Sequence, residues 1–202
     1  MIVRLEWRPF VLSFCDSADS AVHWLHYGRG GTGYALAFDP RLIEQAPFDL
    51  YGVIYDPARQ SAAIQSLVRV MFATTQELRA AAASPELSEI AAHMTATYLR
   101  ALAVRFKHPS FRAEGEWRLI THDLLIDGQP VEDGIPLDTL YRTVAGRIVP
   151  YKEYSPTGFD PSRLVMGASA AMTAHDRGLA QLLEAAGCAT LRVSRSAVAV
   201  RP

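Results

Sequence analysis

The expected fold is decided by the stretch that begins Leu50-Tyr-Gly-Val-Ile-Tyr55-Asp-Pro57 and ends Glu116-Trp-Arg-Leu-Ile-Thr121. Its first six residues favour a β-strand, which Asp56-Pro57 ends. From 58 to about 106 the chain is alanine-rich, with apolar residues three and four positions apart. Because Ser84-Pro85 interrupts this pattern, with Ser84 as a cap and Pro85 in a first turn, it predicts two helices. The alternation from Glu116 to Thr121 predicts a half-buried strand.

Working outward, the flanking sequence adds more strands and one more helix. Strands are expected over 10–15, 34–38, 162–166 and 189–194, with one or two between 141 and 151, and a helix over 174–186. Strands and helices do not alternate regularly, which favours an α+β domain over a doubly wound sheet. We therefore expect one domain over 1–202, with a mixed or antiparallel sheet core and about three helices.

Composition excludes several classes of protein. Of the 202 residues, 50% are hydrophobic and 20% charged, which is typical of a globular protein. The net charge of −1 gives no bulk attraction to nucleic acid or to an anionic membrane. Cys15 and Cys188 lie far apart and are expected to be buried free thiols in a reducing compartment. No apolar run is long enough to span a bilayer and the N-terminus is charged, so we expect a cytoplasmic protein that does not enter a membrane. The six histidines form no compact ligand set, so no metal site is expected.

The first candidate motif combines Ser13 with the glycine- and aromatic-rich segment that contains Trp24, Tyr27 and Gly28 and extends to Gly33. Several glycines in a loop let the backbone approach a ligand, and free amides in succession can bind an anion. Residues 28–33 match G-x-G-x-x-G, although a strand rather than a helix is expected to follow. The alternative is a tight turn with packed aromatic side chains.

The second candidate motif is Glu114-Gly-Glu116-Trp-Arg118. In a strand these three charged residues project from one face, where two carboxylates can divide acid/base and ligand-orienting roles. The alternative is a solvated Glu-Arg ladder at the edge of a sheet.

The third candidate motif places Arg142 and Arg147 on or beside a strand. Arginine is well suited to bind phosphate or carboxylate groups of a ligand. The alternative is that they are salt-bridge partners of Glu114 or Glu116.

These motifs resemble a bacterial domain family of unassigned function, domain of unknown function 2971. The resemblance rests on Leu12-Ser-Phe-Cys15, His23-Trp-x-x-Tyr-Gly28, the segment 106–118 and the later Gly146-Arg-Ile-Val-Pro-Tyr151 and Leu164-Val-Met-Gly167. Family members usually have an upstream strand that this chain lacks. The resemblance therefore implies a shortened member whose cleft is missing one wall.

The order of the motifs also resembles that of ADP-ribosyltransferases, which place a serine-bearing strand before a later Glu-x-Glu strand. This resemblance implies a nucleotide-type ligand, with NAD as the cofactor. Glu116 would then hold the nicotinamide ribose and stabilise the positive charge that develops on it, while Glu114 activates the acceptor. Tyr27 or Trp24 would stack on nicotinamide, and Arg118 or Arg147 would meet the pyrophosphate. The class also expects an Arg or His on an earlier strand, a place that only Arg4 or Arg8 can take.

The competing hypothesis is a non-catalytic binding or interaction module, for example in a defence or toxin-type system. In that case the glutamates and arginines hold the sheet together. An open pocket shared by Glu114, Glu116 and Tyr27 would favour the enzyme, whereas mutual salt bridges would favour the module. The sequence gives no indication of the oligomeric state.

Overall fold

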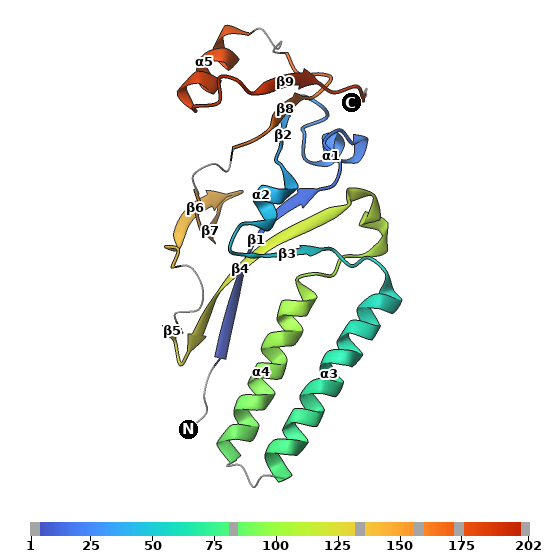
Figure 1. Cartoon of the computed structure of the whole chain (residues 1–202), viewed down its shortest axis with the longest axis vertical. Coiled ribbons are helices and arrows are strands. Elements are labelled where there is room, and N and C mark those ends of the chain that lie inside the picture. Colours follow the sequence, from blue (N-terminus) through green and yellow to red (C-terminus); the bar gives the residue numbers. More distant parts are fainter. Residues whose placement is uncertain (1–4, 81–84, 132–135, 156–159, 172–175, 199–202) are drawn as a thin grey trace. The chain divides into compact units, whose positions relative to one another are not determined.

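The computed structural model describes residues 5–80, 85–131, 136–155, 160–171 and 176–198 (Figure 1). It is an α+β protein with 37% helix, 31% strand and mixed or antiparallel sheets, and its described part holds three helices of seven or more residues. The expected fold class is therefore confirmed. The chain divides into two compact units, and the expectation of a single domain remains a prediction. Unit 1 comprises 1–14, 47–112 and 116–154, and unit 2 comprises 15–46, 113–115 and 155–202.

Unit 1 is built on a sheet of order β1-β4-β3, with β5 paired to the far end of β4. The strands are β1 (Leu5–Cys15), β3 (Asp49–Gly52), β4 (Glu116–Ile126) and β5 (Gln129–Val131). β3 and β4 are antiparallel, with Tyr51 opposite Arg118. This pairing brings together the two strands that were predicted on either side of the helical stretch.

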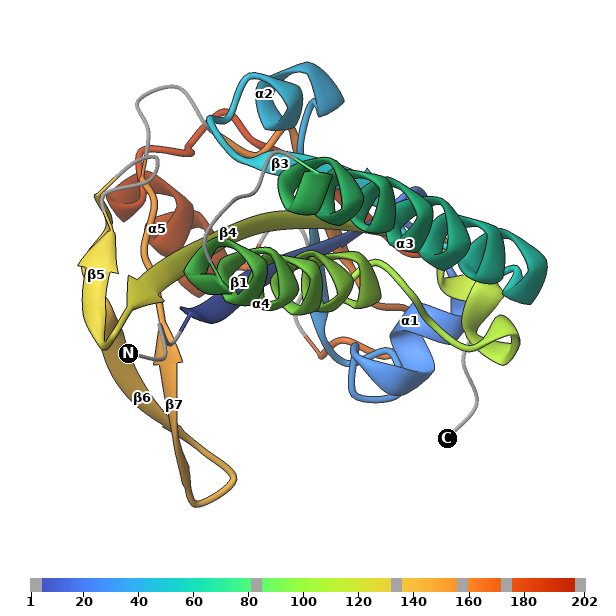
Figure 2. The same ribbon diagram turned by 90° about the horizontal axis from the view of Figure 1, so that it is seen from below.

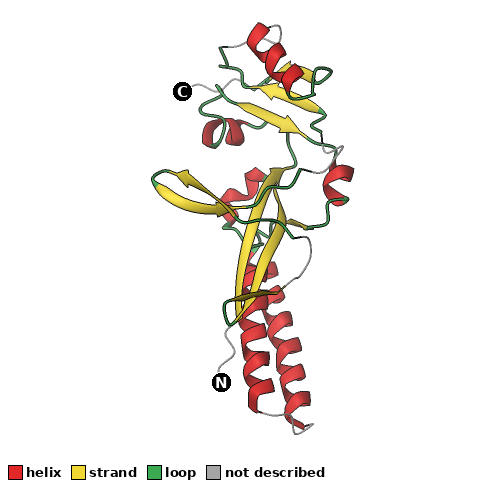
Figure 3. Ribbon diagram, turned by 90° about the vertical axis from the view of Figure 1, so that its left-hand side faces the viewer, coloured by secondary structure: helices red, strands yellow, loops and turns green. Residues whose placement is uncertain are grey.

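The helical stretch of unit 1 forms α3 (Pro57–Ala80) and α4 (Pro85–Ala103), which lie side by side in Figures 1 and 3. The two predicted helices are thus confirmed. Asp56 caps α3, because its side chain accepts from the amide of Ala58 at 2.8 Å and Pro57 occupies the first position. The expected cap at Ser84 lies outside the described residues.

A hairpin of β6 (Leu140–Val144) and β7 (Arg147–Tyr151) completes unit 1. Its two turn residues, Ala145 and Gly146, have φ values of 47° and 76°. Positive φ at both positions gives a type I′ turn, which matches the natural twist of paired strands. Figures 2 and 3 show this turn pointing away from the β1-β4-β3 sheet.

Unit 2 contains a sheet of order β2-β8-β9, in which β2 and β8 are antiparallel and β8 and β9 are parallel. Its elements are α1 (Ala21–His26), β2 (Tyr34–Ala37), α2 (Pro40–Glu44), β8 (Arg163–Met166), α5 (Arg177–Ala185) and β9 (Arg192–Arg195). Leu164, Met166, Ala170 and Leu179 form its main core cluster, and Trp24 packs with Val165 in a second one.

Unit 2 departs from the sequence expectations in four places. The segment from 23 was expected to be a loop, but its first residues belong to α1. The Asp39-Pro40 pair was expected only to end a strand, but it begins α2, which Asp39 caps by accepting from the amide of Arg41. The helix expected over 174–186 begins at Arg177, because Asp176 caps it, and residues 172–175 lie outside the described part. Cys15 and Cys188 are both free, but neither is fully buried, since Cys15 is exposed and Cys188 is partly exposed.

Across the described ranges, no helix combines the length and the apolar character needed to cross a bilayer.

Candidate functional site

The most organised polar cluster in unit 1 surrounds the carboxylate of Glu116, the first residue of β4. Its Oε1 accepts a hydrogen bond from the Ser13 hydroxyl at 2.7 Å and another from Nε of Arg118 at 2.9 Å. Its Oε2 accepts from Nζ of Lys107 at 2.9 Å and from Nη2 of Arg118 at 3.1 Å. Both carboxylate oxygens are therefore occupied by donors from the same unit.

Three elements deliver these donors. Ser13 lies on β1, which neighbours β4 in the sheet, and Arg118 lies two residues along β4 on the same face as Glu116. Lys107 follows α4, and its ammonium lies 5.2 Å from the ring centre of Phe111. A further guanidinium nitrogen of Arg118 donates to the carbonyl of Val104, just beyond α4. The cluster thus ties the end of α4 to two strands of the sheet.

The amide of Glu116 is held as well, since it donates to the hydroxyl of the buried Tyr55 at 2.9 Å. Tyr55 follows β3 and precedes α3. Backbone and side chain of Glu116 are therefore both fixed, and the residue is only 8% exposed.

The electrostatics of the cluster keep Glu116 ionised. Burial by itself raises the pKa of this carboxyl, but hydrogen bonds from Arg118, Lys107 and Ser13 outweigh burial and lower the pKa from 4.5 to about 2. At neutral pH Glu116 is therefore an anion that has no proton to donate.

This lowered pKa predicts how the stability of the protein depends on pH. Because the pKa is lower in the folded than in the unfolded protein, the Glu116 interactions stabilise the fold fully above about pH 4.5, and this contribution is lost as the pH falls toward 2. We expect the difference in unfolding free energy between wild type and Glu116→Gln to shrink steadily below pH 4.5. Urea unfolding of both proteins from pH 7 to pH 3 measures it, and a difference independent of pH would contradict the assignment.

Glu114 does not share a strand with Glu116. It ends the 3-10 helix η1 (Pro109–Glu114), and Gly115, with a φ of 51°, separates it from β4. The expectation that both carboxylates project from one strand face is therefore wrong, because a helical turn and a left-handed glycine stand where extended backbone was expected. In unit 2, the buried Glu114 accepts from the hydroxyl of Tyr27 at 3.3 Å.

Trp24 belongs to the core of unit 2. It is 3% exposed, and its indole nitrogen donates to Asp19 at 2.6 Å. Asp19 also accepts from the hydroxyl of Ser196 and from the amide of Ala197. Trp24 thus offers no open ring face for stacking, whereas Tyr27 is 66% exposed.

The glycine segment after α1 is a turn in which three glycine amides bond to nearby backbone carbonyls. The amide of Gly28 donates to the carbonyl of His23, and those of Gly31 and Gly33 donate to the carbonyl of Gly28. A Cβ at position 28 would meet the Trp24 ring at 2.5 Å, which explains the glycine there. These amides face backbone acceptors rather than a ligand, as the tight-turn interpretation requires.

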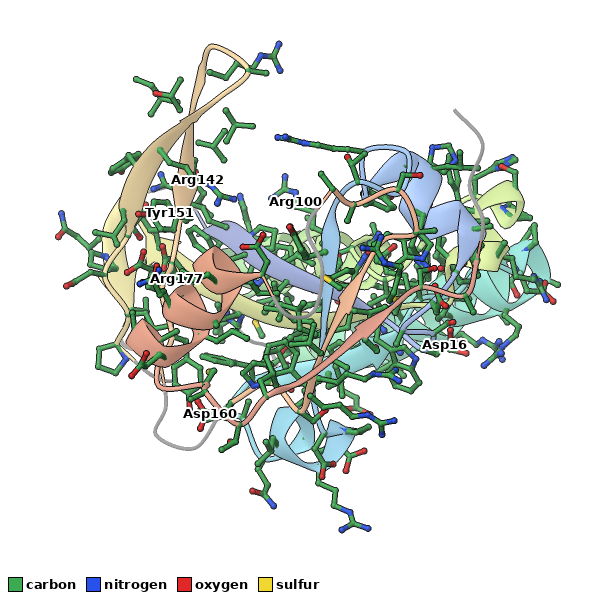
Figure 4. All side chains as sticks on the ribbon, turned by 90° about the horizontal axis from the view of Figure 1, so that it is seen from above. Asp16, Arg100, Arg142, Tyr151, Asp160 and Arg177 are labelled. Atoms are coloured by element: carbon green, nitrogen blue, oxygen red, sulfur yellow. The ribbon has the colours of Figure 1, made fainter. Side chains whose placement is uncertain are left out.

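Arg142 and Arg147 lie on the β6–β7 hairpin and are exposed. The guanidinium of Arg142 lies 5.2 Å from the ring centre of Tyr151 on the same hairpin, and Figure 4 labels both residues. Glu116 pairs instead with Lys107 and Arg118. Arg8, one of the two residues expected to supply the early arginine, pairs with Glu6 at 2.9 Å; the other, Arg4, lies outside the described residues.

Lys107 and Tyr55 are the residues of the cluster that the sequence did not single out. Lys107 stands in the quoted segment 106–118, nine residues before Glu116. No simple period relates the two, because η1 and Gly115, with its positive φ, lie between them. Their opposite charges were the one available signal.

Residues 23–119 match a family model described as a protein of unknown function (DUF2971). Over these residues the chain is similar to the DUF2971 family. The match confirms the resemblance seen in the motifs and includes Trp24, Tyr27, Glu114, Glu116 and Arg118. Ser13 and the β6–β7 hairpin lie outside the matched residues. Comparison of the chain with curated proteins and with solved structures yielded no match.

Proposed function

We propose that the protein is a non-catalytic binding module in which Glu116 is a structural anchor. One observation carries this proposal: both oxygens of Glu116 are already bound by side chains of Ser13, Lys107 and Arg118. An ionised carboxylate offers about four acceptor sites, and four donors fill them here. A ligand hydroxyl would therefore have to displace a donor of the protein itself.

The charge of the cluster supports the same proposal. The Glu116 carboxylate is ion-paired with both Lys107 and Arg118. A carboxylate that stabilises a developing positive charge on a ribose must present its negative charge to the ligand, whereas the charge of Glu116 is already paired within the protein. The arrangement is instead suited to hold the end of α4 against the sheet.

The second candidate is an ADP-ribosyltransferase-like enzyme that uses NAD. The hydrogen bond of 2.7 Å between Ser13 and Glu116 favours it, because it joins the two residues that the motif order of that class brings together. In this case a ribose hydroxyl replaces one of the donors to Glu116.

Release of nicotinamide separates the two candidates. We expect wild-type protein incubated with NAD to release no more nicotinamide than a protein-free sample, and calorimetric titration with NAD to show no heat of binding. Chromatography of the nicotinamide provides the measurement. Release by the wild type that Glu116→Gln abolishes and Glu6→Gln preserves would overturn the structural role and establish the enzyme. All proteins are assayed at 20 °C, a temperature at which even a destabilised domain of this kind is expected to stay folded.

A further inference from the structure

We propose that the outer edge of β6 binds an extended acidic peptide as an added strand. The inference deepens the proposed function and rests on it, since it names the partner class of the binding module. It is carried by the hydrogen-bonding pattern of the β6–β7 hairpin and by the charges on that hairpin.

The backbone of β6 has one edge that β7 does not use. Val144 and Arg147 are paired and close the two-residue turn. Along the hairpin from there, hydrogen-bonded pairs alternate with pairs that are not bonded to each other, and Thr143–Ile148 and Tyr141–Pro150 are of the second kind. In an antiparallel pair only every second residue bonds across, starting here with Val144. Thr143 and Tyr141 therefore direct their amides and carbonyls away from β7. Within the described ranges β6 pairs with β7 alone, and no turn or loop bonds these groups.

The outer edge of β7 is different. The outward residues there are Ile148 and Pro150, by the same alternation. Proline has no amide hydrogen, so an added strand would lack a ladder bond at its centre. The hairpin is therefore blocked on one edge and open on the other.

The side chains around the open edge are suited to a partner strand. Tyr141, which lies on β6 itself, is 69% exposed, so its ring is available to a side chain of the added strand. Hairpins of two strands are only marginally stable, and a third strand adds both ladder bonds and apolar cover. This is the recognition mode in which backbone bonds give affinity and alternate side chains give specificity.

Charge selects an acidic peptide as the occupant. Residues 140–151 contain Arg142 and Arg147 and no acidic residue. Paired residues share a face, so the register places both arginines on the face of the hairpin opposite Tyr141 and Ile148. An acidic side chain on the added strand would lie directly beside Arg142. A second copy of β6 pairing symmetrically would instead set Arg142 against its own counterpart, and like charges directly opposite destabilise a sheet.

The experiment uses the full chain and two fluorescein-labelled probes, an alternating Glu-Val octapeptide and its Lys-Val counterpart. Fluorescence anisotropy is expected to show binding of the acidic probe only. Thr143→Pro removes an outward amide of β6 and is expected to weaken binding about tenfold or more. Ile148→Pro is the matched control, because it removes an outward amide from the edge that Pro150 already blocks, and its affinity should stay within about twofold of wild type.

Arg142→Glu provides a second, independent test. This substitution should weaken binding of the acidic probe and strengthen binding of the basic one. Circular dichroism checks that all variants keep the wild-type fold. The proposal is overturned if the wild type fails to bind the acidic probe, or if Thr143→Pro and Ile148→Pro affect binding equally. A dimer in light scattering that Thr143→Pro dissolves would assign the edge to a second copy. None of these results depends on Glu116, so nicotinamide release still decides the proposed function separately.

Discussion

Replacement of Glu116 by Gln is expected to lower the melting temperature by roughly 5–10 °C. The change removes the carboxylate charge that pairs with Lys107 and Arg118, whose side chains are only 20% and 17% exposed. Loss of one partner from a fully buried pair costs about 3–5 kcal/mol, and we expect about 2–3 kcal/mol here because glutamine keeps one acceptor oxygen. In a chain of this size each kcal/mol shifts the melting temperature by about 2–4 °C. Differential scanning calorimetry at pH 7 measures the shift.

Glu6→Gln is the matched control for this prediction. Glu6 and Arg8 also form an ion pair at 2.9 Å, but their side chains are 47% and 54% exposed. Exposed pairs contribute less than about 1 kcal/mol, so this variant should melt within about 2–3 °C of wild type. Equal shifts in the two variants would mean that the Glu116 cluster is no more than a surface ion pair.

Replacement of Gly167 by Ala is expected to destabilise unit 2 by about 3 kcal/mol. A Cβ at this position would lie 2.1 Å from the carbonyl oxygen of Gly31 and 2.5 Å from its carbonyl carbon. These are backbone atoms, which cannot rotate away as the end of a side chain can. The same contact region holds two hydrogen bonds of 2.9 Å, from the amide of Gly167 to Gly33 and from that of Ser169 to Gly31. The glycine segment and the end of β8 would have to separate.

Hydrogen exchange followed by mass spectrometry measures this effect. Peptides from β2 and β8 should lose protection in Gly167→Ala. Gly30→Ala is the control, because position 30 has open space around it and only its φ of 65° opposes a side chain. Its effect should be about 1–2 kcal/mol. Greater deprotection in Gly30→Ala than in Gly167→Ala would show that backbone crowding is not what selects glycine at 167.

Several features could be predicted from the sequence because they depend on local periodicity. Apolar spacing and Ser84-Pro85 were sufficient for the two helices α3 and α4, and alternation from 116 to 121 was sufficient for the start of β4. The same rule failed at Glu114, where two residues of correct spacing belong to different elements. A short 3-10 turn and one glycine with positive φ have no periodic signature, so the strand pattern extended too far toward the N-terminus.

By itself, the sequence determined the α+β class, the paired helices and the residue types available for a polar site, since these follow from the pattern of neighbouring side chains. Only the tertiary structure decided what Glu116 does. Its partner Ser13 is 103 positions away and becomes a neighbour because β1 pairs with β4, while Lys107 reaches it through a turn that no spacing rule describes. The protonation state of a carboxyl group depends on the charges and donors within a few ångströms in space, and that distance is set by strand pairing rather than by order along the chain.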